Sequence, residues 1–258
     1  MNDLARAWDE AAEGYEAYFV PRFAPWVRTA VDALAPLPDG PILVPCCGTL
    51  PELDALTEHF PGREITGIDL SGGMVRLARA RAAGNPLVNA VEGDAATLDP
   101  RWAGRCAAVV SVFGLQQLPE PDVALAAWAA ALRPGGRLSV VHWPGTIETE
   151  GPFAVMREAL RPHLSPSDRS WEDRLVPALS EVELERDEFV THTMTHPDAE
   201  TLFEAHTRSG PLRPLVTARG ERFVRELREE FLRLAPAGEW THRPGARLLV
   251  ARRRRGDA

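Results

Sequence analysis

The sequence contains no lysine, so all 29 of its Lys-or-Arg positions are arginine. This absence excludes Schiff-base lysine chemistry and the lysine of a phosphate-binding P-loop. Cysteine is scarce too: Cys46 and Cys47 are adjacent, and Cys106 stands alone. An odd count without a CxxC spacing predicts neither a disulfide framework nor a structural zinc site. We therefore expect a reduced, cytoplasmic protein.

Long apolar runs are also missing. No stretch of 18 apolar residues occurs, so no membrane span is expected. The N-terminus is charged and amphipathic, unlike a signal peptide. A formal charge of −8 argues against a nucleic-acid partner, and the basic run 252–255 is expected to be a solvated tail. The expected partner is a small molecule, and the expected assembly is a monomer or homodimer.

What the sequence does contain is a regular alternation of two kinds of segment. Short apolar runs predict strands at 41–46, 64–70, 86–94, 106–113 and 136–143. Helical spacing predicts intervening helices at 50–60, 71–83 and 119–132, the last closed by the sequence RPGG. Continuously apolar strands are typical of a parallel sheet covered on both faces. We therefore expect an α/β, doubly wound Rossmann-like sheet.

The flanking segments predict additions to this sheet. Residues 3–19 and 25–35 have helical spacing but are split by Pro21 and Pro25, and are expected to form a helical lid. The pair 188–195 and 246–254 predicts an antiparallel hairpin edge. Further helices are expected at 152–164, 172–180, 198–207 and 217–234. We divide the single domain, 1–258, into a lid (1–35), a cofactor-binding core (36–143), a helical insertion over the active-site mouth (144–184) and a C-terminal part of the sheet with helices (185–258).

Acidic residues follow two neighbouring predicted strands. Asp69 ends the second strand, where a carboxylate can accept both hydroxyls of a ribose. Asp94 ends the third and can accept an adenine amino group, while the backbone N–H of Ala95 meets a ring nitrogen. Met74, one helical turn after Asp69, can pack on the adenine face. The sequence therefore predicts a cofactor that contains adenosine.

The first predicted turn, in ILVPCCGTLPEL (42–53), is poor in glycine. Only Gly48 remains, Pro51 removes an N–H donor, and Glu52 would repel a phosphate. A cofactor with adenosine, no phosphate and a positive charge fits better, and S-adenosylmethionine has these features. Aromatic residues can hold its sulfonium by cation–π attraction.

At this point the chain resembles a class I S-adenosylmethionine-dependent methyltransferase of the ubiquinone/menaquinone-biosynthesis-like, small-molecule branch. The resemblance covers roughly residues 8–143, through GIDLSGGMVRLARARA, VEGDAATL, VVSVFGLQQLPEP, AALRPGGRLSVVHW and WDEAAEGYEAYF. The first motif departs from it: Val44 stands where the family has an acid, and Cys46 and Leu50 stand where it has glycines. The resemblance implies cofactor contacts at Tyr15, Cys46, Gly48, Asp69, Leu70, Met74, Asp94, Ala95 and Ser111.

Residues after the fourth and fifth strands are the candidates for the acceptor. Phe113, Gln117 and Trp143 are expected to bind it, and His142 and Gln117 are the catalytic candidates, although His142 is equally well read as a structural histidine. No metal is expected, because His192 and His196 would lie about 13 Å apart on a strand.

Two other activities remain open. The altered first motif is compatible with an enzyme that consumes the cofactor without methylating, for example by cyclising its methionine moiety and releasing methylthioadenosine. A non-catalytic binding module on the same fold is the third alternative. Val44 cannot bind the cofactor's amino group, so Glu52 or the carbonyls around Cys46 are left as candidates.

Overall fold

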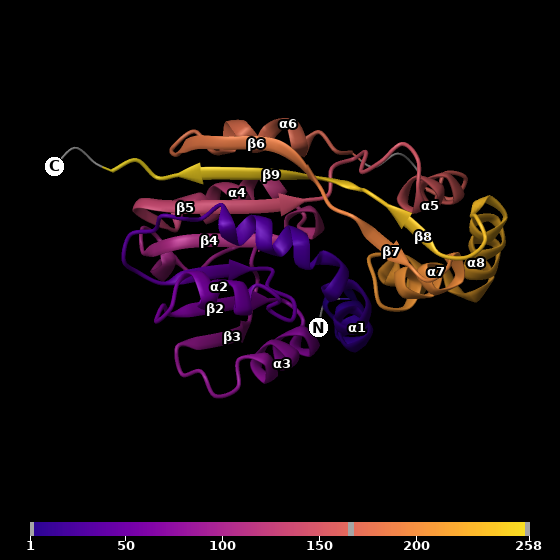
Figure 1. Cartoon of the computed structure of the whole chain (residues 1–258), viewed down its shortest axis with the longest axis horizontal. Helices are drawn as coiled ribbons and strands as arrows, with labels where there is room; N and C mark the ends of the chain where they lie inside the picture. Colours follow the sequence, from indigo (N-terminus) through magenta and orange to yellow (C-terminus); the bar gives the residue numbers. More distant parts are fainter. Residues whose placement is uncertain (1–2, 165–167, 256–258) are drawn as a thin grey trace.

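The computed structural model describes residues 3–164 and 168–255. Its centre is a seven-stranded sheet of order β3-β2-β1-β4-β5-β9-β6 (Figure 1). The strands are β1 Ile42–Pro45, β2 Ile65–Asp69, β3 Val88–Glu92, β4 Cys106–Val112, β5 Leu132–His142, β6 Glu183–Thr191 and β9 Gly245–Arg252. The first five are parallel, and β9 runs antiparallel to both β5 and β6. The predicted Rossmann-like sheet with an antiparallel C-terminal edge is confirmed.

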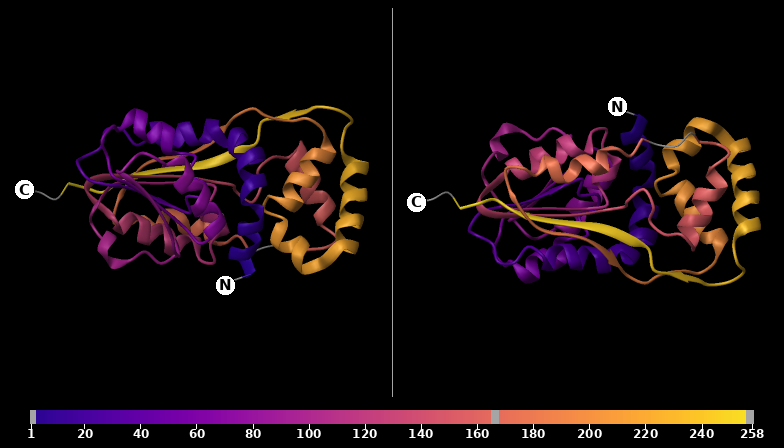
Figure 2. Two further views of the ribbon diagram at one scale, coloured as in Figure 1. Left: turned by 90° about the horizontal axis from the view of Figure 1, so that it is seen from below. Right: turned by 90° about the horizontal axis from the view of Figure 1, so that it is seen from above.

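Helices cover both faces of the sheet (Figure 2). One face packs against α1 Asp3–Asp32, α2 Leu53–His59 and α3 Gly72–Arg81, and the other against α4 Pro121–Ala130 and α6 Trp171–Ala178. Short 3₁₀ turns, η1 Pro100–Trp102 and η2 Leu115–Gln117, flank β4. All four residues of β1 are buried, as expected of a strand covered on both faces.

A cap of helices lies beyond one end of the sheet. It consists of α5 Pro152–Leu160, α7 Ala199–Arg208, α8 Arg213–Leu234 and a two-stranded ribbon of β7 Met194–His196 and β8 Trp240–His242. Its own apolar cluster includes Met156, Phe203 and Phe231. No helix among the described residues is long and apolar enough to cross a membrane.

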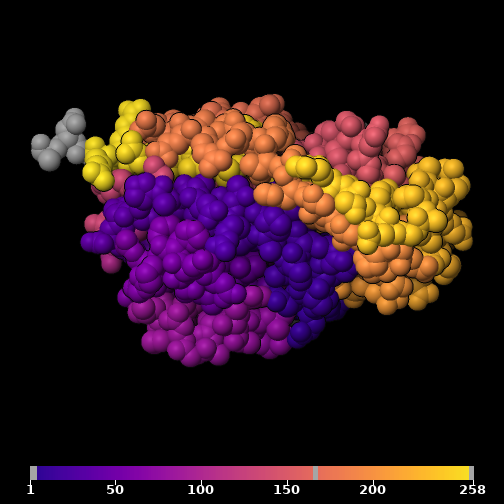
Figure 3. Space-filling model, in the orientation of Figure 1, coloured from indigo at the N-terminus to yellow at the C-terminus, as the bar shows by residue number. Residues whose placement is uncertain are grey.

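The N-terminal segment differs from its prediction. Instead of two helices broken at Pro21 and Pro25, α1 is a single helix with both prolines inside. Each interior proline costs about 3 kcal/mol. Burial of Phe19, Phe23 and Trp26 in the core, at about 1.5–3 kcal/mol each, offsets that cost. In Figure 3 the indigo atoms of this N-terminal segment cover part of the front of the molecule, in the same orientation as Figure 1.

The segment 144–184 also differs. Only α5 belongs to the cap, whereas α6 returns to the sheet and packs beside α4, with Trp171 and Leu175 in the core. The prediction that 144–184 forms one helical insertion over the active-site mouth is therefore wrong for the second half of this segment. The edge strand β6 begins at Glu183, five residues earlier than predicted, and the short strand β8 was not predicted.

The sequence RPGG was predicted to close a helix, but it lies inside β5. The strand register shifts between Cys106 and Ala108 at this point. Gly136 permits the close approach, because a Cβ there would lie 2.8 Å from the carbonyl oxygen of Cys106. The preceding helix α4 does end before RPGG, at Ala130, and the chain uses RPGG as a bulge in β5.

Candidate active site

Two cavities adjoin where the carboxyl ends of the parallel strands meet α1 and the cap. The strand-end cavity has a volume of about 240 Å³, and the aromatic cavity has about 660 Å³. Trp8, Tyr15, Phe113 and Gln117 line both, so a molecule in one cavity can meet a molecule in the other across these side chains. Doubly wound folds bind their ligands at the carboxyl ends of the strands.

The strand-end cavity contains most of the predicted cofactor contacts. Its lining includes Tyr15, Cys46, Gly48, Asp69, Leu70, Met74, Asp94 and Ala95. Among the described lining residues the charged side chains are the two carboxylates, and none is basic. Such a lining suits a ligand that carries hydroxyl, amino and cationic groups, and disfavours a phosphate.

Asp69 is held in place by the first turn and by the start of α3. Its Oδ2 accepts a hydrogen bond from the backbone N–H of Gly48 at 2.8 Å, and its Oδ1 accepts one from Ser71 at 3.0 Å. Burial raises the pKa of Asp69, although these two backbone donors act in the opposite direction. Each oxygen keeps a further lone pair for a ligand hydroxyl.

The lid is tied to the same place. Ser71 caps α3, its hydroxyl accepting from the backbone N–H of Met74 at 3.1 Å. That hydroxyl donates to Oδ1 of Asp9 on α1 at 2.6 Å, and the backbone N–H of Gly73 donates to the same oxygen at 2.9 Å. Asp9 therefore fixes the first turns of α1 over the cofactor side of the site.

Asp94 and Ala95 are positioned by their own loop. Asp94 Oδ1 accepts from the backbone N–H of Ala96 at 2.8 Å, and the indole N–H of Trp128 donates to the carbonyl of Ala95 at 2.8 Å. Both residues line the strand-end cavity. A side chain of α4, on the far face of the sheet, thus orients the loop that was predicted to meet an adenine.

The first turn keeps a glycine-type backbone without the glycines. Cys46, Gly48 and Leu50 have φ of 53°, 51° and 59°, all in the left-handed region. That conformation costs a side-chain-bearing residue about 1–2 kcal/mol. Surrounding contacts hold it: Leu50 is fully buried, and the backbone N–H of Leu50 donates to Cys47 at 2.7 Å.

The aromatic cavity is built around a stacked pair. The rings of Phe113 and Trp143 lie 4.0 Å apart between centroids with 7° between their planes, and Phe23 packs edge-on against both. The predicted residues Phe113, Gln117 and Trp143 all line this cavity. Lining residues that were not predicted include Trp8, Phe19, Phe23, Ile147, Phe153, Met156, Leu160, Leu164, His206 and Leu212.

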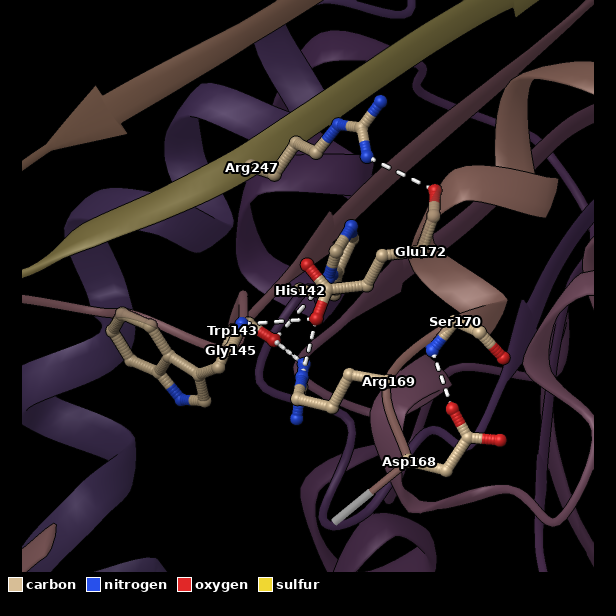
Figure 4. Close-up of polar contacts among 8 residues, drawn as sticks. All are labelled: His142, Trp143, Gly145, Asp168, Arg169, Ser170, Glu172 and Arg247. Carbon is tan, nitrogen blue, oxygen red and sulfur yellow. Dashed lines mark hydrogen bonds and ion pairs between the residues drawn. The ribbon is translucent and has the colours of Figure 1, made fainter. Parts of the chain in front are cut away.

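His142 does not face this cavity, which corrects its prediction as a catalytic residue. Successive side chains of a strand point to opposite faces of the sheet. The side chain of Trp143 therefore points into the aromatic cavity, and that of His142 points into the core on the face covered by α4 and α6. There its ring packs 5.5 Å from Trp171, and its Nδ1 is 3.3 Å from the carbonyl oxygen of Trp143 (Figure 4). Burial lowers the pKa of His142 to about 4. It lines neither cavity and is a structural histidine.

Ser111 is corrected for a similar reason. Its side chain is completely buried, lines neither cavity and points toward Gly114, with its Oγ 3.1 Å from where a Cβ on that glycine would be. Val112 and Phe113, the next residues along the chain, line the strand-end cavity instead.

His206 is the one histidine among the described residues that line the aromatic cavity. Its Nδ1 is 3.0 Å from the carbonyl oxygen of Leu202, which can only accept, so the hydrogen is assigned to Nδ1 and Nε2 keeps its lone pair. The ring packs between Phe19 and Phe153. Burial lowers the pKa of His206 to about 4, so the ring is neutral at pH 7 and can accept a hydrogen bond.

The other histidines near the cap hold its segments together. Tyr18 contacts Nδ1 of His196 at 2.8 Å, His196 contacts His242 at 3.1 Å, and His242 contacts Glu148 at 2.7 Å. His192 is hydrogen-bonded to Thr29 at 2.9 Å, so its ring does not share a site with that of His196. No group of three metal-ligating side chains occurs in the part of the chain that the structure describes.

Comparison with known proteins gives a consistent result. A family model described as a methyltransferase domain matches residues 42–136. Nocamycin O-methyltransferase of Saccharothrix syringae is 30% identical over 251 residues, covering 93% of this chain and 81% of the relative. Demethylmenaquinone methyltransferase of Renibacterium salmoninarum is 28% identical over 60% of this chain and 64% of the relative. The structure of the (4+2)-cyclase SpnF, 19% identical, shares the fold with a TM-score of 0.56 over 90% of this chain and 81% of that one.

Proposed function

Because the chain belongs to the class I S-adenosylmethionine-dependent methyltransferases, we propose that it methylates a small, largely apolar, ring-bearing acceptor in the aromatic cavity. S-adenosylmethionine is the family's cofactor and, when bound, supplies an electrophilic methyl group on a sulfonium. The remaining work of the protein is to bring the acceptor's nucleophile in line with that methyl group and to exclude water.

The strand-end cavity fits this cofactor. Asp69 is the residue that would hold the ribose hydroxyls, and Asp94 with the backbone of Ala95 would hold the adenine edge. Met74 forms an apolar wall of the same cavity. Tyr15 and Trp8, at the junction of the two cavities, supply aromatic faces for a sulfonium. The absence of a basic side chain from the described lining supports a cationic ligand.

The aromatic cavity is the observation that supports the acceptor class. A volume of about 660 Å³ lies in the ~300–1,000 Å³ range of small-molecule sites. Two of its three arginines are paired with acids, Arg161 with Glu158 and Arg169 with Glu172, and Arg157 donates to the backbone carbonyl of Glu148. The lining therefore favours an uncharged acceptor. His206 Nε2 and the Gln117 amide are the groups that would orient its polar atom.

The relatives agree with this acceptor class. Their names, nocamycin O-methyltransferase and demethylmenaquinone methyltransferase, give small-molecule acceptors. We place the present chain in secondary metabolism on the strength of the first of them, which it matches along most of its length.

The test is methyl transfer from methyl-labelled cofactor to a panel of uncharged polycyclic phenols and quinols, with DNA, RNA and protein in parallel reactions. The proposal expects label in a small molecule, S-adenosylhomocysteine as co-product, and loss of labelling in Trp143→Ala. The matched control is His142→Phe, which changes the neighbouring residue on the opposite face and should label normally. Label in macromolecules alone, or release of methylthioadenosine, would contradict the proposal.

A further inference from the structure

The ring of His206 is held in one orientation between two helices that cover the aromatic cavity. It lies edge-on to Phe19 of α1 and Phe153 of α5, at 5.2 and 5.7 Å between ring centroids. The contact of Nδ1 with the carbonyl oxygen of Leu202 fixes the rotation of the ring. Gly210 permits this packing, because a Cβ there would lie 2.9 Å from the ring of Phe19. The fold therefore sets the direction in which Nε2 of His206 points.

This second ring nitrogen is open to the cavity. Nε2 of His206 has no hydrogen-bond partner among the described residues, and it stays accessible, whereas the unpartnered Nε2 of His142 is completely buried. Since His206 is only 6% exposed and lines the aromatic cavity, that cavity is where its Nε2 is accessible. With the hydrogen assigned to Nδ1, Nε2 offers a lone pair to a molecule bound there.

The other ionisable side chains of the cavity lining are less suited to accept a proton from such a molecule. The three arginines have no acceptor atom. Glu158 is exposed and is paired with Arg161 at 2.7 Å. Burial raises the pKa of the Tyr15 hydroxyl, which keeps it protonated at pH 7. Among the described lining residues, His206 is therefore the buried proton acceptor.

The surroundings of His206 keep its ring neutral. Burial, more than the neighbouring His242 of β8, lowers the pKa of His206 to about 4, while its hydrogen bond to Leu202 acts in the opposite direction. His196 of β7 is a further titratable neighbour, and Tyr15 of α1 and Glu158 of α5 line the same cavity. A proton taken up by this ring at pH 7 is therefore passed on to solvent.

Methyl transfer moves one positive charge from the sulfonium to the acceptor. A hydroxyl oxygen that gains the methyl group and keeps its hydrogen becomes a cation, which is a far stronger acid than an imidazolium. A weakly basic nitrogen can therefore take its proton. An aliphatic amine would enter this apolar cavity as a second cation beside the sulfonium, which desolvation and like charge disfavour. A neutral lone pair thus favours a hydroxyl as the nucleophile.

We propose that His206 is a catalytic residue that accepts the proton of a hydroxyl group on the acceptor, and that the product is a methyl ether. A lone pair of the oxygen forms the C–O bond while the S–C bond breaks and leaves its electrons on sulfur. The O–H electrons remain on oxygen, and the proton goes to Nε2. This inference rests on the proposed function and adds the nucleophile to it. His206 lies outside residues 42–136, which match the family model.

The experiment is single-turnover methyl transfer to one phenol between pH 6.5 and pH 9.5. The probe is a phenol of the panel above that the wild-type protein labels and whose own pKa is about 10, as for tyrosine. At pH 7, His206→Phe should be slower than wild type by about a hundredfold or more, because the proton has no acceptor. Its rate should rise with pH in proportion to the ionised fraction of the phenol, whereas the wild-type rate should stay nearly constant.

Two controls separate this role from a structural one. His206→Phe should bind S-adenosylhomocysteine as the wild-type protein does, because His206 does not line the strand-end cavity. Calorimetry of this binding also reports that the variant is folded. The matched substitution is His142→Phe, which replaces a buried histidine that lines neither cavity and should keep the wild-type rate and pH profile.

An undiminished rate in His206→Phe, or a loss of the same size at every pH, would overturn the role of His206. A product methylated on carbon or nitrogen would do the same. So would Glu158→Gln, if that variant showed the pH-dependent loss expected here of His206→Phe. These outcomes leave the proposed function in place. If the wild-type protein transfers label to no small molecule, the proposed function fails and this inference fails with it.

Discussion

Cys46 and Gly114 are packed so closely that a Cβ on Gly114 would lie 2.3 Å from the Cβ of Cys46. The turn after β1 and the turn after β4 meet at this contact, directly beneath the strand-end cavity. Cys46 occupies the space in spite of its left-handed backbone, and Gly114 accommodates it. The first turn has a cysteine where the family has a glycine, and a glycine in the turn after the neighbouring strand leaves room for it.

This contact predicts a measurable coupling. Gly114→Ala should destabilise the protein by about 1–3 kcal/mol, the usual cost of overpacking. Cys46→Gly removes the clashing atoms and relieves the left-handed strain, so the double variant should recover most of the loss. Urea unfolding of the four proteins gives the coupling energy. Strictly additive effects would show that the two turns do not constrain each other.

Asp69 should dominate the affinity for the nucleoside. Asp69→Ala is expected to weaken binding of S-adenosylhomocysteine by about 1.5–3 kcal/mol, because a charge-assisted hydrogen bond is lost in a buried site. 5′-Methylthioadenosine, which has the same nucleoside without the amino acid, should lose as much. Asp99→Ala, at an exposed loop, is the control. Calorimetry showing undiminished affinity in Asp69→Ala would remove Asp69 from the ribose.

Asp9 should hold the N-terminal turns of α1 against the start of α3. Asp9→Ala removes the acceptor of two hydrogen bonds to the start of α3, so the first turns of α1 should exchange their amide hydrogens faster while the sheet stays protected. Methyl transfer should fall in parallel. Glu13→Ala, which breaks only the exposed pair with Arg76, should change neither measurement. Faster exchange throughout the sheet would instead indicate general destabilisation.

Two buried histidines predict a loss of stability in acid. Burial lowers the pKa of both His142 and His206 to about 4, below the unfolded value of about 6.5. Between these values the unfolded chain binds more protons than the folded one, so stability falls as the pH is lowered, by at most about 1.4 kcal/mol per pH unit for each histidine. Denaturation at pH 7.5 and pH 5 should show this decline, and His142→Phe with His206→Phe should reduce it. An unchanged slope would contradict the neutral, buried assignment.

The site residues that directly follow a strand could be predicted from the sequence. Those that come from distant parts of the chain could not. Asp69 and Asp94 were found because a strand end and the following turn are local features, which the sequence shows directly. Phe153 and His206 were missed because only the tertiary fold brings α5 and α7 over the cavity. His142 was assigned to the wrong face because a continuously apolar strand does not reveal which residues point which way. The break predicted at Pro21 and Pro25 of α1 was wrong for a related reason. The burial that stabilises this helix despite its prolines depends on tertiary contacts, which the local sequence does not show.

The most direct test of the central claim, that the strand-end cavity holds S-adenosylmethionine, is a calorimetric titration of the wild-type protein with S-adenosylhomocysteine and, separately, with NAD. The two ligands share adenosine but differ in charge, since NAD carries a pyrophosphate that the acidic lining and Pro51 disfavour. Saturable one-to-one binding of S-adenosylhomocysteine without binding of NAD is the predicted result. Binding of NAD in place of S-adenosylhomocysteine would contradict it.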